Sequence, residues 1–464
     1  MASTAAARPD GAGLRRGPLL ALAALATAVV AGRLAAGDLV GDPVIYAALA
    51  KAMVQRGDWG TLFLAGKPFF DKPPLVIWLT ALSFETFGVT TWSARLAGAV
   101  PGVLACLVLA RLGTLLAGPD VGLAAGAILA LTPGFVRFAS TLLLDPMMLL
   151  AALLALLAMA RAWERGGRGL WRAGAWFGVA FLAKGALALI AVPILPILWV
   201  ATPATSRPPA RALVAAAVAF LAVVLPWHLY ELAQWDGAFV RGYLYDVQEK
   251  MGGHPPLETY LRALGVTTLP WLPLAAIGAW RAWRPGAGRW PALRLLVVWT
   301  AVAYGALLLA GKHSPRYLML LHPAVALWAA FAVAPVLGRR VAPAVAIVAV
   351  LAWLAILVWP RPFHPSGTGA AVVALAPELG PPQHAVIGFR LRHEGTRARF
   401  AYYLDRDVET SDDIEALAAL SPGTLVVTAA RDAPVLVADG RFRETARSRD
   451  FVTFRVATPD GRPR

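Results

Sequence analysis

Long apolar runs separated by short polar connections repeat through the first 360 residues. Runs of about 17–25 mostly apolar residues are long enough to cross a bilayer as helices. The pattern predicts about eleven such helices, near residues 17–36, 93–115, 121–138, 142–160, 171–184, 186–201, 211–230, 263–283, 292–310, 317–335 and 341–360.

Arginines gather in alternate connections between these runs, at residues 15–16, 161–172, 207–211, 281–294 and 339–340. Connections rich in arginine stay on the cytoplasmic side of a membrane. We therefore expect a multi-pass protein of the bacterial plasma (inner) membrane, with a cytoplasmic N-terminus and a C-terminus on the periplasmic or extracellular face. A cleaved signal over residues 1–36 is the alternative reading of the first run, because an Arg-Arg pair precedes it.

The composition supports a membrane protein. Of the 464 residues, 58% are hydrophobic and 15% are charged, whereas about 25% of residues in soluble domains are charged. This excludes a disordered, fibrous or ordinary cytosolic protein. The net charge of +16 follows from the arginines of the connections, so no nucleic-acid partner is expected. The single cysteine, Cys106, excludes an intrachain disulfide and a cysteine metal site.

The composition changes after residue 360. Acidic runs and turn signals separate strand-like segments at 385–389, 423–428 and 451–456, and residues 413–420 have a helical pattern. This pattern predicts a small soluble α/β domain. The predicted organisation is a transmembrane domain over 1–360 and an outer-face (periplasmic or extracellular) α/β domain over 361–464.

The first outer loop, residues 37–92, is long and carries several aspartates and lysines. Its stretches 46–54 and 75–87 are amphipathic and too short or interrupted to span, so we expect helices lying in the membrane interface. Such helices also serve as simple anchors, and the sequence leaves that alternative open.

Asp145 is an acidic residue at the start of a strongly apolar run. An ionisable group at membrane depth marks a functional site. Helix capping is the alternative, since Asp followed by Pro is favoured where a helix begins.

The lysines form a second pattern. Only six of the 43 basic residues are lysine, and all six fall on the predicted outer side: Lys51, Lys67, Lys72, Lys184, Lys250 and Lys312. A flexible point charge is a common phosphate ligand. The lysines therefore indicate an anion site at the outer leaflet, with interfacial snorkelling as the alternative. The seven histidines show no paired metal spacing.

Several motifs occur together in a recognisable order. The segments GDPVIYA at 41–47, GDW at 57–59 and GKPFFDKPPLVIWL at 66–79 resemble the first-loop signature of GT-C membrane glycosyltransferases, specifically the aminoarabinose-transferase and dolichyl-phosphate-mannose–protein mannosyltransferase superfamily. Further matching motifs follow: RL at 95–96, LDP at 144–146, LAKG at 182–185, PW at 226–227 and 270–271, KHSPRY at 312–317 and HP at 322–323.

The resemblance implies an enzyme that moves a sugar from a polyprenyl-phosphate carrier to an acceptor on the outer face of the membrane. Asp42 matches the catalytic aspartate of the first loop, and Asp145 matches the second acidic position. Pro43 stands where the family commonly has Glu, so no second carboxylate is carried over there. Lys72 matches a residue that contacts the carrier phosphate, and Tyr46 matches an aromatic residue one helical turn after Asp42.

Other residues extend these implied roles. Lys312 and Arg316 are further candidates for binding the donor phosphate, and Tyr317 and Lys51 are candidates for binding the substrate. Asp71 and His254 occupy places where some relatives bind a metal. The motifs require no cofactor. The resemblance leaves open whether the enzyme uses a divalent metal ion.

The residue chemistry agrees with such a reaction. A polyprenyl-phosphate leaving group needs cations to neutralise its developing charge, and an acceptor hydroxyl needs a base such as Asp42. A single in-line displacement inverts the anomeric centre. The sequence contains no phosphate-binding glycine loop of the nucleotide-binding type, which argues against a nucleotide-sugar donor or an ATP-driven pump.

The expected partners are a polyprenyl-phosphate-linked sugar, a lipid or protein acceptor and membrane lipid. The acceptor group is a hydroxyl or phosphate of lipid A, a protein or an envelope glycan. The alternative function is a transporter or flippase of a polyprenyl-linked or anionic lipid, whose signature is an inverted repeat with matching broken helices. No second copy of the DKPP loop is present, and the long charged first loop favours an enzyme.

Overall fold

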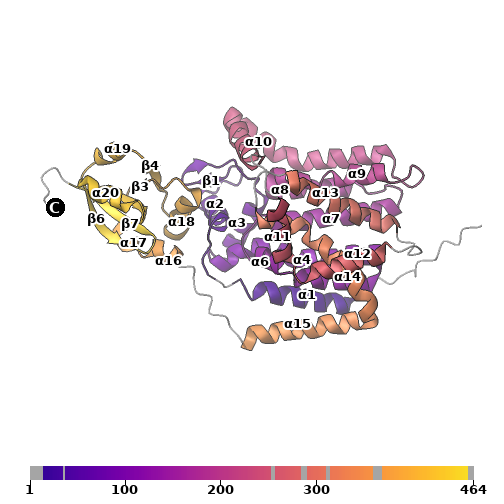
Figure 1. Ribbon diagram of the computed structural model, residues 1–464. Coiled ribbons are helices and arrows are strands. Elements are labelled where there is room, and N and C mark those ends of the chain that lie inside the picture. The colour runs from indigo at the N-terminus through magenta and orange to yellow at the C-terminus, as the bar shows by residue number, and fades with distance from the viewer. Residues whose placement is uncertain are drawn as a thin grey trace, which may run out of the picture. The chain divides into compact units, whose positions relative to one another are not determined.

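A computed structural model describes residues 14–34, 37–251, 257–283, 290–309, 314–358 and 368–457 (Figure 1). It divides into two compact units. The first contains residues 1–34, 71–76 and 97–361, and the second contains residues 35–70, 77–96 and 362–464. Each unit is described separately below.

The first unit is helical. Its elements are α1 (Arg16–Ala31), α4 (Thr91–Ala117), α5 (Pro119–Ala130), α6 (Pro133–Ala139), α7 (Asp145–Glu164), α8 (Trp171–Lys184), α9 (Ile194–Ala201), α10 (Ala210–Met251), α11 (Leu257–Thr268), α12 (Trp271–Ala282), α13 (Trp290–Leu309), α14 (His322–Leu337), α15 (Val341–Val358) and the 3-10 turns η1 (Gly185–Ile190), η2 (Pro315–Leu320) and η3 (Gly338–Arg340). The first residues of α4 belong to the second unit.

Each apolar run of the sequence lies largely in helix, as predicted. Within the described residues, five helical stretches are long and apolar enough to cross a membrane. The number rises to as many as seven if each of two bent pairs, α5 with α6 and α11 with α12, is one span. These findings confirm a polytopic helical protein, while the number eleven stays a prediction.

Small residues let these helices approach closely. A Cβ atom at Gly174 of α8 would lie 1.8 Å from the carbonyl oxygen of Ala216 in α10, and one at Gly278 of α12 would lie 1.8 Å from that of Trp328 in α14. Membrane helices commonly associate through such contacts. In Figure 1, α1 and α15 also lie side by side.

Helix α10 exposes an apolar stripe. Val214, Val218, Leu221, Leu225 and Leu229 follow helical spacing, and each is at least 41% exposed. Exposing such a stripe to water is unfavourable in free energy, whereas contact with lipid tails carries no such penalty. The stripe therefore supports a lipid-facing position for α10.

The second unit combines the first loop with the carboxyl-terminal segment. From the first loop come α2 (Asp42–Arg56), β1 (Phe63–Leu64), β2 (Lys67–Pro68) and most of α3 (Leu75–Phe87). From the carboxyl-terminal segment come α16 (Thr368–Val373), α17 (Ala376–Leu379), β3 (Val386–Phe389), α18 (Glu394–Leu404), β4 (Glu409–Ser411), α19 (Ile414–Ala418), β5 (Leu425–Ala429), α20 (Ala433–Asp439), β6 (Phe442–Arg447) and β7 (Phe451–Val456).

The carboxyl-terminal strands form one mixed sheet in the order β4-β3-β5-β7-β6. Strand β3 is parallel to both β4 and β5, while β7 is antiparallel to β5 and β6. The three predicted strand segments and the helix predicted near 413–420 are confirmed as β3, β5, β7 and α19. The α/β character predicted for this segment is therefore correct.

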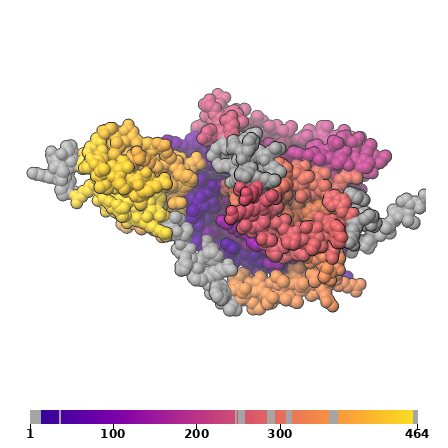
Figure 2. Space-filling view, viewed as in Figure 1, coloured from indigo at the N-terminus to yellow at the C-terminus, as the bar shows by residue number. Residues whose placement is uncertain are grey.

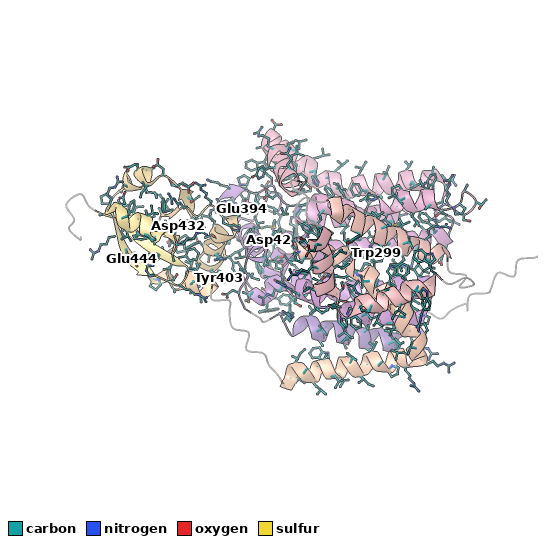
Figure 3. The ribbon with its side chains drawn as sticks, in the orientation of Figure 1. Asp42, Trp299, Glu394, Tyr403, Asp432 and Glu444 are labelled. Carbon is teal, nitrogen blue, oxygen red and sulfur yellow. The ribbon has the colours of Figure 1, made fainter. Side chains whose placement is uncertain are left out.

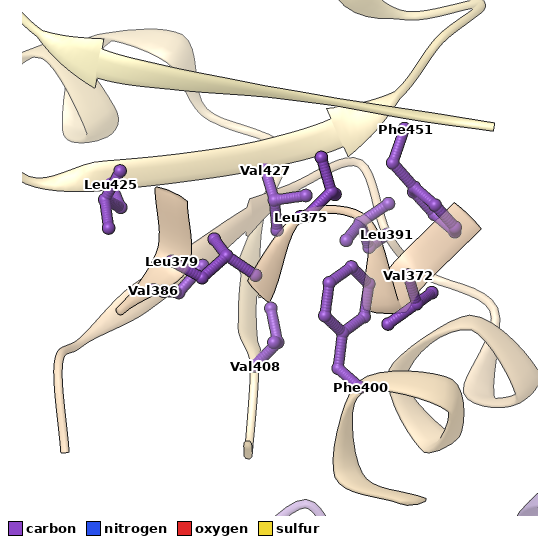
Figure 4. Close-up of a cluster of buried hydrophobic side chains, with 10 residues drawn as sticks. All are labelled: Val372, Leu375, Leu379, Val386, Leu391, Phe400, Val408, Leu425, Val427 and Phe451. Atoms are coloured by element: carbon purple, nitrogen blue, oxygen red, sulfur yellow. The ribbon is translucent and has the colours of Figure 1, made fainter. Parts of the chain in front are cut away.

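Two apolar clusters lie on the sheet. One gathers Val386, Leu425 and Val427 of the strands with Phe400 of α18 and Leu379 of α17 (Figure 4). The other gathers Val426, Val452 and Phe454 with Leu436 of α20. Because successive strand residues point to opposite faces, helices cover both faces. The surface of this domain is orange to yellow in Figure 2.

Helix α2 packs against α18 of the same unit. The buried ammonium of Lys51 donates a hydrogen bond of 2.7 Å to the carbonyl oxygen of Tyr402 and lies 2.7 Å from Asp405 Oδ1. The carboxylate of Asp38 accepts from the backbone N–H of Gly369 at 2.8 Å. Burial raises the pKa of the Tyr403 hydroxyl, which accepts from the backbone N–H of Leu39 at 3.1 Å.

The packing of α2 bears on two predictions. The helices predicted over 46–54 and 75–87 are present as α2 and α3, and their location in the membrane interface stays a prediction. The domain boundary at 360/361 also stays a prediction, and the contacts add that residues 35–70 and 77–96 form one compact unit with the sheet domain.

We predict that Lys51→Met loosens the packing of α2 on α18. The variant removes a charge-assisted hydrogen bond to a buried carbonyl, and each such bond contributes about 1.5–3 kcal/mol. Amides of α18 should then exchange about tenfold faster in hydrogen-exchange mass spectrometry of the full chain. The control is Lys67→Met, which neutralises an exposed lysine of the same loop. Equal protection in both variants would contradict a structural role for Lys51.

Candidate active site

Asp145 opens helix α7 within the first unit. It is 1% exposed, and Pro146 follows it in the first turn, where its missing N–H costs no helical hydrogen bond. The N-cap residue is Leu144, so Asp145 lies one position inside the helix rather than at the cap. Asp145 Oδ1 forms an ion pair with the ammonium of Lys184. The ion pair with Lys184 is therefore an interaction that helix capping alone does not require.

Lys184 ends helix α8, which packs along α7. The next residue, Gly185, has φ +70°, a conformation that residues with a side chain rarely adopt. A Cβ atom there would lie 3.0 Å from the hydroxyl of Tyr243 and 3.3 Å from Cδ of Pro73. The turn after Lys184 thus brings the DKPP segment and α10 to the end of α8.

The turn η2 supplies an aromatic and a cationic side chain to the same place. The ammonium of Lys184 lies 5.1 Å from the ring centroid of buried Tyr317, within reach of a cation–π interaction. The half-buried guanidinium of Arg316 lies 5.8 Å from the same ring. Trp299 of α13 (Figure 3) donates to the carbonyl oxygen of Leu320 at 3.1 Å, which fixes the end of η2.

Asp71 and Lys72 belong to the same unit and are half-buried. The Lys72 ammonium donates to the backbone carbonyl oxygen of Asp71 at 3.0 Å. The first unit therefore gathers Asp145, Lys184, Tyr317 and the DKPP segment at one end of α7 and α8. We call this set the α7–α8 cluster.

A cleft of about 410 Å³ lies beside η2. It is lined by Pro315, by Arg137 of α6, and by Glu258, Arg262 and Thr267 of α11. Pro315, which lines the cleft, directly precedes Arg316 in the sequence, and the side chains of the lining carry charges of both signs. These features are typical of a site for a polar ligand.

Asp42 and Tyr46 lie in the second unit, on the first two turns of α2 (Figure 3). The Tyr46 hydroxyl donates to Asp42 Oδ2 at 3.3 Å, as the spacing of one helical turn allows. Asp42 is half-buried and Tyr46 is 4% exposed. Gly41, with φ +71°, turns the chain into the helix. The hydrogen bond orients the carboxylate of Asp42.

The remaining predicted residues have different positions. Lys51 is held by Tyr402 and Asp405, as described above, which favours a structural role over substrate binding. Lys312 and His254 lie outside the described residues. Among the described residues, no group of three or more His, Cys, Asp or Glu side chains could hold a metal ion. The metal role of Asp71 and His254 therefore stays a prediction.

Sequence reasoning placed Lys184 among the six lysines that indicate an anion site, and did not pair it with Asp145. The signal was present, because a lysine ends an otherwise apolar helical run and belongs to the LAKG motif. A charge in that position needs an opposite charge, and Asp145 was the acidic residue already predicted at membrane depth. Pairing the two required the packing of α7 on α8, which no local pattern specifies.

The sequence is similar to those of known membrane glycosyltransferases. A family model of dolichyl-phosphate-mannose-protein mannosyltransferases matches residues 71–230. The chain is 28% identical over 297 residues to the undecaprenyl phosphate-α-4-amino-4-deoxy-L-arabinose arabinosyl transferase of Yersinia enterocolitica, covering 60% of this chain and 52% of the relative. It is 29% identical over 308 residues to the Pseudomonas aeruginosa transferase of the same name, covering 61% and 53%. The chain thus spans about half the length of these relatives.

Solved structures share the fold. The structure of ArnT from Cupriavidus metallidurans bound to undecaprenyl phosphate superposes with a TM-score of 0.79 at 19% identity, covering 96% of this chain and 99% of that one. The oligosaccharyltransferase AglB of Archaeoglobus fulgidus superposes with a TM-score of 0.58 at 13% identity, covering 92% of this chain and 72% of that one.

Fold and motifs together define a class: the chain is a polytopic membrane protein with the GT-C fold. Within that class its sequence is similar to the aminoarabinose transferases, which confirms the resemblance noted from its sequence motifs.

We predict that the Asp145–Lys184 pair is energetically coupled. Removing one partner of a buried ion pair costs about 3–5 kcal/mol, whereas replacing both with neutral groups costs far less. Asp145→Asn and Lys184→Met should each lower the midpoint of thermal unfolding in detergent, and the double variant should regain most of the loss.

Asp120→Asn, at an exposed helix start, is the matched control and should leave the midpoint unchanged. If the double variant lost the sum of the two single losses, the two groups would be independent.

Proposed function

We propose that the chain is a glycosyltransferase that takes a sugar from a polyprenyl-phosphate carrier, such as undecaprenyl phosphate, and transfers it to an acceptor. The observation that carries the proposal is the α7–α8 cluster, where a buried Asp145–Lys184 pair adjoins Tyr317, Arg316 and the DKPP segment. Buried charges within apolar helices are costly and mark ligand sites. Similarity to enzymes named for transfer from undecaprenyl phosphate supports the same donor class.

The carrier phosphate is the leaving group, and its negative charge grows as the glycosidic bond breaks. Preorganised cations stabilise such charge most strongly in a site shielded from water. We assign this task to Lys72 and Arg316 of the first unit, together with Lys312. The cleft beside Pro315 is suited to the sugar, whose hydroxyls need polar partners such as Arg137, Glu258 and Arg262. Tyr317, two residues after Pro315, remains our candidate for contacting the substrate.

The acceptor needs a base, and we assign that role to Asp42. Its carboxylate is half-buried and accepts a hydrogen bond from the Tyr46 hydroxyl, which orients it, and a carboxylate can take a proton from an acceptor hydroxyl. Attack from the face opposite the leaving phosphate inverts the anomeric carbon. Asp145 then acts through Lys184 as a positioning residue for the cationic side of the site.

The arginine pattern gives the proposed placement in the membrane. We propose a bacterial inner-membrane protein with a cytoplasmic N-terminus and with residues 361–464 on the periplasmic or extracellular face. The acceptor is a hydroxyl or phosphate of lipid A, a protein or an envelope glycan. The proteins that resemble this chain are named as transferases, so they give the transporter alternative no support.

We predict that Asp42→Asn lowers the rate of sugar transfer or donor hydrolysis at least about a hundredfold, the usual contribution of a general base. The assay uses purified full-length protein and a panel of radiolabelled polyprenyl-phosphate sugars. Asp120→Asn makes the same chemical change at an exposed position and should retain wild-type turnover. Full activity of Asp42→Asn would refute the assignment of the base.

We also predict that Lys72→Met lowers kcat/KM for the donor and raises KM, because its ammonium binds the phosphate in the ground state as well as stabilising the charge that grows on it. The control is Lys67→Met, five residues earlier on the same loop and exposed. An unchanged KM, or equal effects of the two variants, would place the phosphate elsewhere.

A further inference from the structure

The sheet domain contains a topological switch point. From β3 the chain passes through α18 to β4 on one side of β3, and then through α19 to β5 on the other side. Helices leaving β3 and β5 therefore diverge at the carboxyl ends of two adjacent parallel strands. In open α/β sheets, ligands bind in the crevice outside this point.

A cleft of about 1010 Å³ lies at this edge of the sheet. Its walls are the segment that follows β3, the segment that follows β5, and the turn from Arg449 to Phe451 between β6 and β7. The turn before β7 lies at the same edge of the sheet as the carboxyl end of β5, because Ala429 at the end of β5 pairs with Phe451 at the start of β7. We call this cleft the switch-point cleft.

Arginines dominate the lining of the switch-point cleft: Arg390, Arg392, Arg399, Arg431 and Arg449. The acidic side chains that face it are Asp432 and Asp450. Arg392 is paired with Asp412 at 2.6 Å, and Arg431 with Asp432 at 3.3 Å. The lining therefore carries an excess of positive charge even after its ion pairs are counted.

Three of the arginines have no ion pair within the part of the chain that the structure describes: Arg390, Arg399 and Arg449. Nε of Arg399 is buried and makes no hydrogen bond to any described residue. Buried donors without a partner are costly and rare. Arg390 has φ +55°, a strained conformation in a residue with a side chain, and its guanidinium lies 4.8 Å from the ring centroid of Phe389.

We propose that the switch-point cleft binds a phosphate-bearing ligand, either a phosphorylated saccharide or a phospholipid headgroup. Guanidinium groups bind phosphate through two parallel hydrogen bonds, and several unpaired guanidiniums facing one cleft favour a ligand with more than one anionic oxygen. Helix α18 begins at this cleft, and its N-terminal partial charge favours the same sign of ligand. The cleft volume is at the upper end for small-molecule sites, about 300–1,000 Å³, and accommodates a sugar together with its phosphate.

The binding experiment uses the purified full chain in a neutral detergent and isothermal titration calorimetry. The probes are inorganic pyrophosphate, α-D-glucose 1-phosphate, and phosphatidylglycerol in mixed micelles with the same detergent. The variants Arg399→Gln and Arg449→Gln each remove one unpaired charge. Arg449 is exposed, so its variant keeps the fold even if Arg399→Gln does not.

Arg443→Gln is the matched control, because Arg443 is an exposed arginine of β6 that does not line the cleft. The proposal predicts that a phosphate probe binds the wild type and that each cleft variant weakens this binding about tenfold. Arg443→Gln should change it less than about twofold. Tighter binding of glucose 1-phosphate indicates a saccharide ligand, and tighter binding of phosphatidylglycerol micelles indicates a lipid headgroup.

Three outcomes overturn the proposal: no probe binds, the cleft variants bind as the wild type does, or Arg443→Gln weakens binding as much as they do. The second outcome would assign the phosphate to another site, such as the α7–α8 cluster. Asp42→Asn should bind every probe as the wild type does, so loss of transfer and loss of cleft binding are separate results.

Discussion

The pairing of a buried carboxylate with a buried ammonium, Asp145 with Lys184, is the constraint on which the first unit depends. Each charge alone would be several kcal/mol unfavourable among apolar helices, so each requires the other. The pair fixes the start of α7 against the end of α8. From that fixed point Gly185 turns the chain past Pro73 and Tyr243, and Tyr317 closes over the ammonium.

Sequence patterns were sufficient for the helices of the apolar runs and for β3, β5, β7 and α19, while β4, β6, α16, α17, α18 and α20 were not predicted. Apolar runs predicted the helices because membrane-length hydrophobicity is a property of contiguous residues. The strand-like segments at 385–389, 423–428 and 451–456 predicted strands of the sheet for the same reason. The number of spans did not follow as directly. Breaks between α5 and α6 and between α11 and α12 bend the chain by 65° and 98°, and a hydropathy pattern registers a bend of this kind only weakly.

The sequence predicted which residues are candidates for the site better than it predicted which residues they contact. Asp42 with Tyr46, one turn apart, is a local relation that spacing encodes, and the hydrogen bond between them is present. Lys51 shows the opposite case. Its sequence neighbourhood indicated an anion site, while its actual partners, Tyr402 and Asp405, lie about 350 residues further along the chain. Tertiary contacts over such separations leave no trace in a single sequence.

The contact of α2 with α18 also bears on how modular this chain is. A boundary drawn by composition near residue 360 suggests an interchangeable outer module joined by a linker. Within the second unit, residues 35–70 and 77–96 form one compact body with the carboxyl-terminal segment, and α2 packs on α18. A chimaera that exchanged only the last hundred residues would place Lys51 against the carboxyl-terminal segment of another protein. In that other protein, the segment evolved to contact a different lysine, or no lysine. Grafts that carry both chain segments together are the natural units of exchange in this architecture.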